Sequence, residues 1–184
     1  GIGYNYGTYP KNATLATLPF FKQFSAGGPY SMRAWGLRQL GLGSSNSYDS
    51  ITATNFRDRY GDMIIEANIE YRFIMATIAG VKVGSAIYTD IGNIWNVKNS
   101  TTDPNANFSL AKLGHDIAIS VGTGLRLDFD YFLIRFDLAY KMKDPLRVSN
   151  NGWMRFKNFN WTDIRPNGLE VSNFALQLGI GLPF

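Results

Sequence analysis

The chain has 184 residues, of which 45% are hydrophobic and 15% aromatic, and its formal net charge is +4. This length indicates one domain and at most two, and the absence of cysteine excludes disulfide frameworks, thiol catalysis and Cys-ligated metal sites. The basic residues form no block, so the charge gives no indication of a nucleic-acid partner.

The first residues, GIGYNYGTYP, combine neither a basic segment nor an apolar one, as a signal peptide would. We therefore expect the chain to be an internal or mature fragment. It also contains no run of about 18 apolar residues, the length that a transmembrane helix requires.

Alternation of apolar and polar side chains predicts β-strands along the chain. In the first clear case Ile69 and Phe73 alternate with Glu66, Glu70 and Arg72. The same two-residue period gives five strands, at residues 63–75, 81–92, 116–128, 132–141 and 174–184, and a shorter strand is expected around residues 2–6.

Alternation alone is also compatible with a soluble β-sandwich or a lipocalin-like barrel. Three features favour a transmembrane barrel. The apolar faces carry no charge, and the strands reach about 10 residues, enough to cross a bilayer at a tilt. The connections alternate in length: they are short near residues 76–80 and 128–131, and long before residue 60, at 96–115 and at 143–171.

This rhythm predicts a topology as well as a fold. In outer-membrane barrels the short turns are periplasmic and the longer loops external. We therefore expect the short turns and the C-terminus on the periplasmic side, with Phe184 in an interfacial aromatic girdle.

Six strands do not close a barrel of this kind, and an open edge is not tolerated in lipid. The chain could be the C-terminal part of a larger barrel, its loops could contain two further strands, or several copies could assemble. The first alternative is the simplest.

Two stretches carry a resemblance to a known family. The stretch FKQFSAGGPYSMRAWGLRQLG resembles the loop of the BamA/TamA (bacterial surface antigen) family, whose tip is Arg-Gly-aromatic where this chain has Arg33-Ala34-Trp35. GDMIIEANIEYRF and IYTDIGNIW look like the two strands that follow that loop.

The resemblance extends to the end of the chain. The second of those strands matches an aromatic-x-Asp-x-Gly pattern with Tyr88, Asp90 and Gly92. FALQLGIGLPF is similar to the C-terminal β-signal of outer-membrane proteins. These elements occur in the family's order.

The resemblance implies an all-β, antiparallel, sixteen-stranded transmembrane β-barrel preceded by periplasmic domains. Residues 1–184 would form its C-terminal part, with about the last six strands. Residues 18–60 would be a loop inserted into the lumen, and residues 174–184 the terminal strand.

In that family the loop arginine meets acidic residues on the inner wall, and the alternation places Glu70 and Asp90 on the inward face here. We therefore expect Arg33 to bridge Glu70 and Asp90 and to lock the loop to the wall. The supporting motif residues are Gly27, Gly28, Trp35, Tyr88 and Gly92.

The function implied is the insertion of β-barrel clients, or the export of passengers, through a lateral seam without nucleotide hydrolysis. Partners would be the lipid bilayer of the bacterial outer membrane, unfolded outer-membrane protein clients, and periplasmic or lipoprotein accessory subunits. The seam would lie at the terminal strand, whose candidate residues are Phe174, Leu176, Leu178, Gly179, Ile180, Gly181, Leu182 and Phe184. The alternative function is a passive outer-membrane pore or an outer-membrane hydrolase.

No catalytic constellation is predicted. His115 is the only histidine, and it lies beside Asp116 at the end of a polar loop. Inward carboxylates such as Glu66 and Glu70 are expected in any polar barrel. We therefore expect no enzyme activity, no cofactor and no metal.

Overall fold

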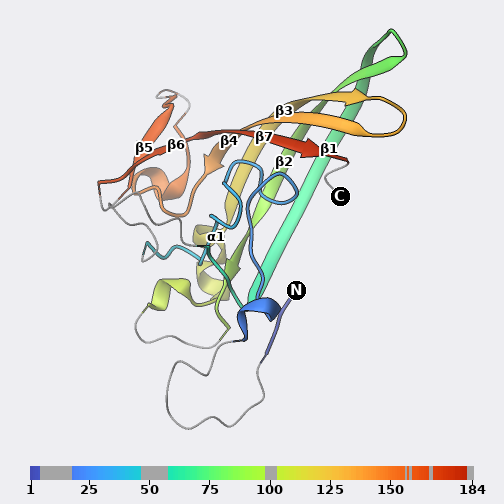
Figure 1. Ribbon diagram of the computed structural model, residues 1–184. Coiled ribbons are helices and arrows are strands. Elements are labelled where there is room, and N and C mark those ends of the chain that lie inside the picture. The colour runs from blue at the N-terminus through green and yellow to red at the C-terminus, as the bar shows by residue number, and fades with distance from the viewer. Residues whose placement is uncertain are drawn as a thin grey trace.

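The computed structural model describes residues 1–4, 18–46, 58–97, 103–155, 157, 159–165 and 168–181. Long antiparallel strands dominate it (Figure 1). The strands are β1 (Met63–Ile78), β2 (Val81–Trp95), β3 (Ala118–Asp128), β4 (Leu133–Lys143), β5 (Thr162–Ile164), β6 (Glu170–Ser172) and β7 (Phe174–Ile180).

The helical segments are short. Among the described residues they are α1 (Leu113–Asp116) and 3₁₀ turns at Phe20–Lys22, Pro104–Ala106, Leu110–Lys112 and Ser149–Gly152. In the part of the chain that the structure describes, no helix is long and apolar enough to cross a membrane.

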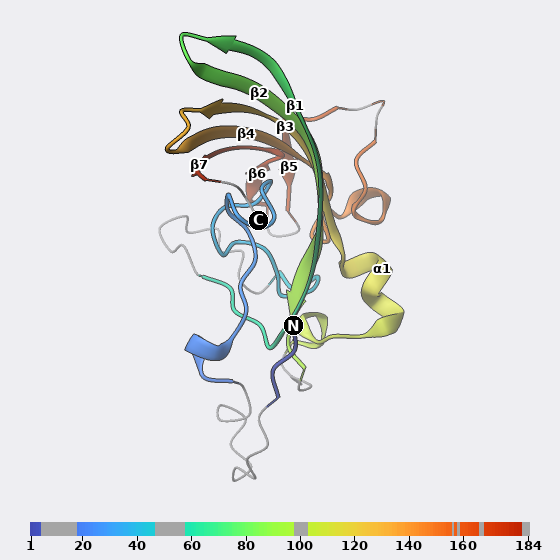
Figure 2. The ribbon, with the colours of Figure 1, turned by 90° about the vertical axis from the view of Figure 1, so that its right-hand side faces the viewer.

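The main sheet has five strands in the order β1-β2-β3-β4-β7, and all neighbours are antiparallel. The sheet is strongly curved and open, with β1 and β7 at its edges (Figure 2). An antiparallel, all-β fold is thus confirmed, and the described strands do not close the sheet into a barrel.

Connections of different length lie at opposite ends of the sheet (Figure 1). Ala79 and Gly80 join β1 to β2 with φ of 50° and 84°, as a tight hairpin turn requires. At the other end lie the 96–117 connection with α1 and the 144–173 connection. The latter contains the β5–β6 hairpin, which the sequence did not predict because strands of three residues show no clear period.

The register separates two faces. One row across the sheet reads Tyr71, Ile87, Thr123, Leu138 and Leu176, and the next reads Arg72, Ala86, Gly124, Asp137 and Gln177. The first row lies on the convex face, where most of its large apolar side chains are more than half exposed. The predicted alternation of an apolar face and a polar face is confirmed.

Two predicted strands differ in extent from the structure. Ile2 forms an isolated bridge with Met63, while Asn5 and Tyr6 lie outside the described residues. The last strand ends at Ile180, because Gly181 adopts a φ of +87°. Leu182, Pro183 and Phe184 lie outside the described residues, and with them the predicted girdle position of Phe184.

Aromatic side chains gather where β4 and β7 approach the long connections. The ring centroid of Phe174 lies 4.6 Å from those of Tyr140 and Trp161, and Phe159 stacks on Tyr140 at 4.9 Å. Such clusters are typical of strand ends at the membrane interface.

The assignment of the two faces predicts a difference between neighbouring residues of β7. Leu178→Arg should lower the free energy of unfolding by about 2–4 kcal/mol, because Leu178 is exposed on the convex, lipid-facing side. Gln177→Arg should cost less, because its side chain lies on the polar inner face, among charged residues. Urea titration of the full-length protein in lipid measures both values, and equal losses would contradict the assignment.

The topology predicts which positions are accessible from outside the cell. Cysteine in place of Leu110 or Val148, which are 78% and 72% exposed, should react with a membrane-impermeant thiol reagent on intact cells. Cysteine in place of Tyr131, 97% exposed in the β3–β4 turn, should react only after the outer membrane is permeabilised. Because the chain has no cysteine of its own, labelling of Tyr131→Cys on intact cells would invert the topology.

Candidate functional site

The segment 18–46 runs along the concave face of the sheet, and its tip lies within the curve (Figure 2). The tip is tightly closed, since the backbone N–H of Gly28 donates to the carbonyl of Trp35 at 2.9 Å. Gly27 has a φ of +109°, and a Cβ there would lie 2.2 Å from the carbonyl oxygen of Gly36. The double glycine is therefore required by the path of the backbone.

Arg33 lies at this tip and is fully buried between two carboxylates. Its Nη1 is 2.7 Å from Glu70 Oε2 on β1, and its Nη2 is 2.7 Å from Asp90 Oδ1 on β2. The Nε and the backbone N–H of Arg33 both donate to Asp90 Oδ2 at 3.0 Å. The planar fork thus separates two acidic groups on neighbouring strands that would otherwise repel each other.

An aromatic ring completes the arginine's surroundings. The guanidinium carbon of Arg33 lies 3.3 Å from the ring centroid of Tyr88, which is a cation–π contact. Tyr88 in turn lies over Gly122 of β3, where a Cβ would meet the phenol at 2.4 Å. A side chain at position 122 would therefore displace the ring on which Arg33 rests.

The remaining predicted motif residues pack around the tip. Trp35 is 4% exposed and belongs to the hydrophobic core together with Met32, which is fully buried. At Gly92 a Cβ would lie 2.6 Å from the carbonyl oxygen of Ile65 and 3.3 Å from Met32 Sδ. Gly92 therefore lets the loop approach the wall closely.

Ala34 replaces the glycine of the family's tip without backbone strain. Among the described residues, the non-glycine positions with positive φ are Arg38, Ala79, Asp130, Asn150 and Asn151. Ala34 is thus in a conformation that any L-residue adopts, and at 2% exposure its methyl group is buried.

The charge network continues beyond the predicted residues. Glu70 also accepts from Arg72 at 2.7 Å and from Arg126 of β3 at 2.6 Å. Arg126 lies 3.1 Å from Asp137 of β4, which in turn pairs with Arg135. Alternation placed these residues on the inner face, but their partners depend on the register between strands.

Two residues of the inner face bind the loop backbone, and one of them, Arg135, also belongs to the charge network. Arg135 donates to the carbonyl of Pro29, and the amide of Gln177 on β7 donates to the carbonyls of Arg33 and Trp35 at 3.3 and 3.2 Å. The tip of the loop therefore contacts residues from β1, β2, β4 and β7.

The predicted terminal-strand residues divide between the two faces. Leu176, Leu178 and Ile180 are 73%, 60% and 67% exposed on the convex face. Gly179 lies on the inner face, where a Cβ would meet the Arg135 guanidinium at 2.5 Å. The structural effect of Gly179 is therefore to leave room for Arg135.

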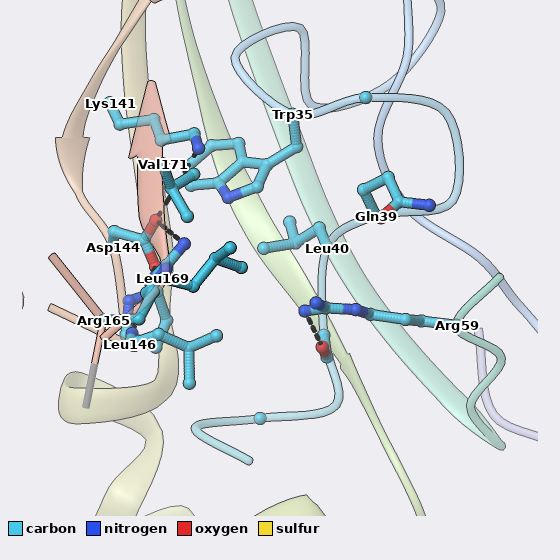
Figure 3. Close-up of a pocket in the computed structure, with 14 residues that line it drawn as sticks. Trp35, Gln39, Leu40, Arg59, Lys141, Asp144, Leu146, Arg165, Leu169 and Val171 are labelled. Atoms are coloured by element: carbon cyan, nitrogen blue, oxygen red, sulfur yellow. Dashed lines mark hydrogen bonds and ion pairs between the residues drawn. The ribbon is translucent and has the colours of Figure 1, made fainter. Parts of the chain in front are cut away.

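A cavity of about 270 Å³ lies beside the loop tip, between it and the 144–173 connection (Figure 3). Trp35 and Leu40 line one side, and Leu169 comes from the connection. The ammonium of Lys141 lies 5.5 Å from the Trp35 ring centroid and donates to the carbonyl of Ser172 at 3.0 Å.

A buried ion pair fixes the far side of this cavity. Arg165 donates to both oxygens of Asp144, at 2.9 and 2.8 Å. Burial alone would raise the pKa of Asp144, but Arg165 and Lys141 outweigh this effect and hold it well below its usual value. Because that pKa is lower in the folded state, the stabilisation is complete above about pH 4 and is lost only in stronger acid.

The described residues contain no cluster of three or more potential metal ligands. His115 Nδ1 lies 3.2 Å from Asp116 Oδ1, and within the described ranges no hydroxyl side chain is hydrogen-bonded to its ring.

A curved antiparallel sheet with an apolar outer face, and a loop buried on a charged inner face, defines a β-barrel fragment of the outer-membrane type. Residues 2–182 match the Omp85 superfamily domain, and the chain belongs to this superfamily. The comparisons with curated proteins and with solved structures gave no match.

This membership agrees with the resemblance to the BamA/TamA family. Omp85 proteins are bacterial outer-membrane proteins that assemble or translocate other proteins, generally without enzymatic chemistry. They generally work with outer-membrane clients and accessory subunits.

The buried contacts of Arg33 predict strong energetic coupling. Arg33→Ala should lower the free energy of unfolding by about 3–5 kcal/mol, because it removes the cation that pairs with the buried Asp90 and one of the three that pair with Glu70. Arg33→Lys should restore only part of this, since an ammonium lacks the planar fork. In the double variant Arg33→Ala/Asp90→Asn, the free energy of unfolding should fall by less than the sum of the two single losses, with a difference of about 0.5–3 kcal/mol.

A double-mutant cycle by urea titration measures this coupling. The Arg38–Asp58 pair, at 2.9 Å but 45% and 43% exposed, provides the matched control and should show little coupling. Additive losses at Arg33 and Asp90 would mean that the two side chains do not interact in the membrane.

Proposed function

We propose that this chain forms the C-terminal part of the barrel of an outer-membrane assembly or translocation factor. It inserts β-barrel clients, or exports passengers, through a lateral seam at β7 and without nucleotide hydrolysis. The observation that carries this proposal is the anchoring of the loop tip by Arg33 to Glu70 and Asp90, in a chain of the Omp85 superfamily.

The edge of the sheet supplies the second element of the proposed mechanism. β7 pairs only with β4 among the described strands, and its other edge is open. An open edge offers backbone donors and acceptors to an incoming strand, which binds by β-augmentation. The seam would therefore form between β7 and the first strand of the complete barrel.

The loop anchor has a defined role in this mechanism. Arg33 connects the tip to β1 and β2, and the side chain of Gln177 connects it to β7. The loop therefore contacts both edge strands of the sheet. We infer that it keeps the curvature of the sheet constant while the seam opens. Arg33, Glu70 and Asp90 are positioning residues in this proposal.

The proposal predicts a loss of client insertion without a loss of the barrel. In liposomes containing the full-length protein, Arg33→Ala should slow the folding of a β-barrel client about tenfold or more. A factor of ten corresponds to about 1.4 kcal/mol, which is within the free energy expected from the lost contacts of Arg33. Arg38→Ala, which removes an exposed arginine of the same segment, should leave the rate unchanged. Folded client is measured by its gel mobility before and after heating.

A second readout in the same liposomes distinguishes the alternatives. Efflux of a small entrapped solute in the absence of client folding would favour a passive pore and contradict the proposal. Equal client folding by the wild-type protein and by Arg33→Ala would remove the loop anchor from the mechanism.

A further inference from the structure

The open edge of β7 is not uniformly available for pairing. Gly181 N–H donates to the carbonyl of Leu133, and Lys141 N–H donates to that of Asn173, so residues 173 and 181 direct their backbone groups toward β4. Because direction alternates along an antiparallel strand, residues 174, 176, 178 and 180 direct theirs toward the open edge.

At one end of this edge a tyrosine from the loop occupies the backbone. The hydroxyl of Tyr30 donates to the carbonyl of Ile180 at 2.6 Å and accepts from the N–H of Ile180 at 3.3 Å. A single side chain thus satisfies both groups that a neighbouring strand would use. The Arg135 guanidinium supports the ring of Tyr30 at 4.9 Å from its centroid.

At the other end a serine makes the same pair of contacts. The hydroxyl of Ser172 donates to the carbonyl of Phe174 at 2.9 Å and accepts from the N–H of Phe174 at 3.1 Å. Between the two hydroxyls lie Leu176 and Leu178, for whose edge-directed groups the described part of the chain supplies no partner.

We propose that Tyr30 and Ser172 delimit a pairing window on the edge of β7 that consists of Leu176 and Leu178. The partner that fits this window is a β-strand whose own edge is unpaired, joined by only a few backbone hydrogen bonds. Such a short pairing is weak, which suits a junction that must open and reclose.

The two limits of the window differ in kind. Ser172 is two residues from Phe174 and moves with the strand, whereas Tyr30 belongs to the loop and is 150 residues from Ile180 in sequence. Displacing Tyr30 would lengthen the window by one residue. The position of the loop tip therefore sets the number of bonds that β7 offers, an inference that rests on the proposed seam function.

Amide hydrogen exchange of the full-length protein in lipid nanodiscs tests the window directly. In protein labelled with ¹⁵N at isoleucine and phenylalanine, Tyr30→Phe should speed exchange of the Ile180 amide about five- to tenfold and leave Phe174 unchanged. Ser172→Ala should speed exchange of the Phe174 amide and leave that of Ile180 unchanged. Tyr131→Phe, which removes the hydroxyl of a 97% exposed tyrosine in the β3–β4 turn, should change neither amide.

A functional readout tests the coupling. The exchange measurement contains no client, so the Ile180 groups stay unpaired in it once Tyr30 no longer contacts them. When a client is present, its incoming strand should pair with β7 along a longer edge, and client folding in liposomes should speed up about threefold, by about one hydrogen bond. Unchanged exchange at Ile180 in Tyr30→Phe would overturn the window. Faster exchange with an unchanged client-folding rate would overturn the coupling to the loop.

The two proposals fail in different ways. If the wild-type protein folds no client, the proposed function fails, while the exchange measurement still decides whether Tyr30 occupies the edge.

Discussion

The arrangement of the inner face depends on one buried cation. Arg33 carries its charge into a fully enclosed position, which is costly unless every donor of the guanidinium finds an acceptor. Glu70 and Asp90 accept hydrogen bonds from Nη1, Nη2 and Nε, and the ring of Tyr88 lies against the guanidinium. These partners come from β1 and β2, and the cation lies between the two carboxylates. The loop and the wall are therefore each incomplete without the other.

This mutual requirement extends through shared partners. Glu70 accepts from three arginines, so the position of Arg126 on β3 depends on the carboxylate that Arg33 also uses. Through Asp137 and Arg135 the network reaches Pro29, on the other side of the loop tip. Low local dielectric makes such a network stiff when complete and costly when one member is lost.

Much of the fold was predictable from the sequence because strand alternation is a local property. Residues 63–75 show their two faces without knowledge of any other strand, and the double glycine with Arg33 marks the loop. The contact between Arg126 and Asp137 was not predictable, because it depends on the register between β3 and β4. The contact between Tyr30 and Ile180 was not predictable either, because it depends on where the loop tip lies along β7. The β5–β6 hairpin was missed because its strands are too short for a period.

Arg135 and Gln177 bind the loop through the main-chain carbonyls of Pro29, Arg33 and Trp35. Every residue has a main-chain carbonyl. These hydrogen bonds therefore depend on the path of the loop backbone and not on which side chains the loop carries. Side-chain identity at the tip is constrained instead by the burial of Met32, Arg33 and Trp35.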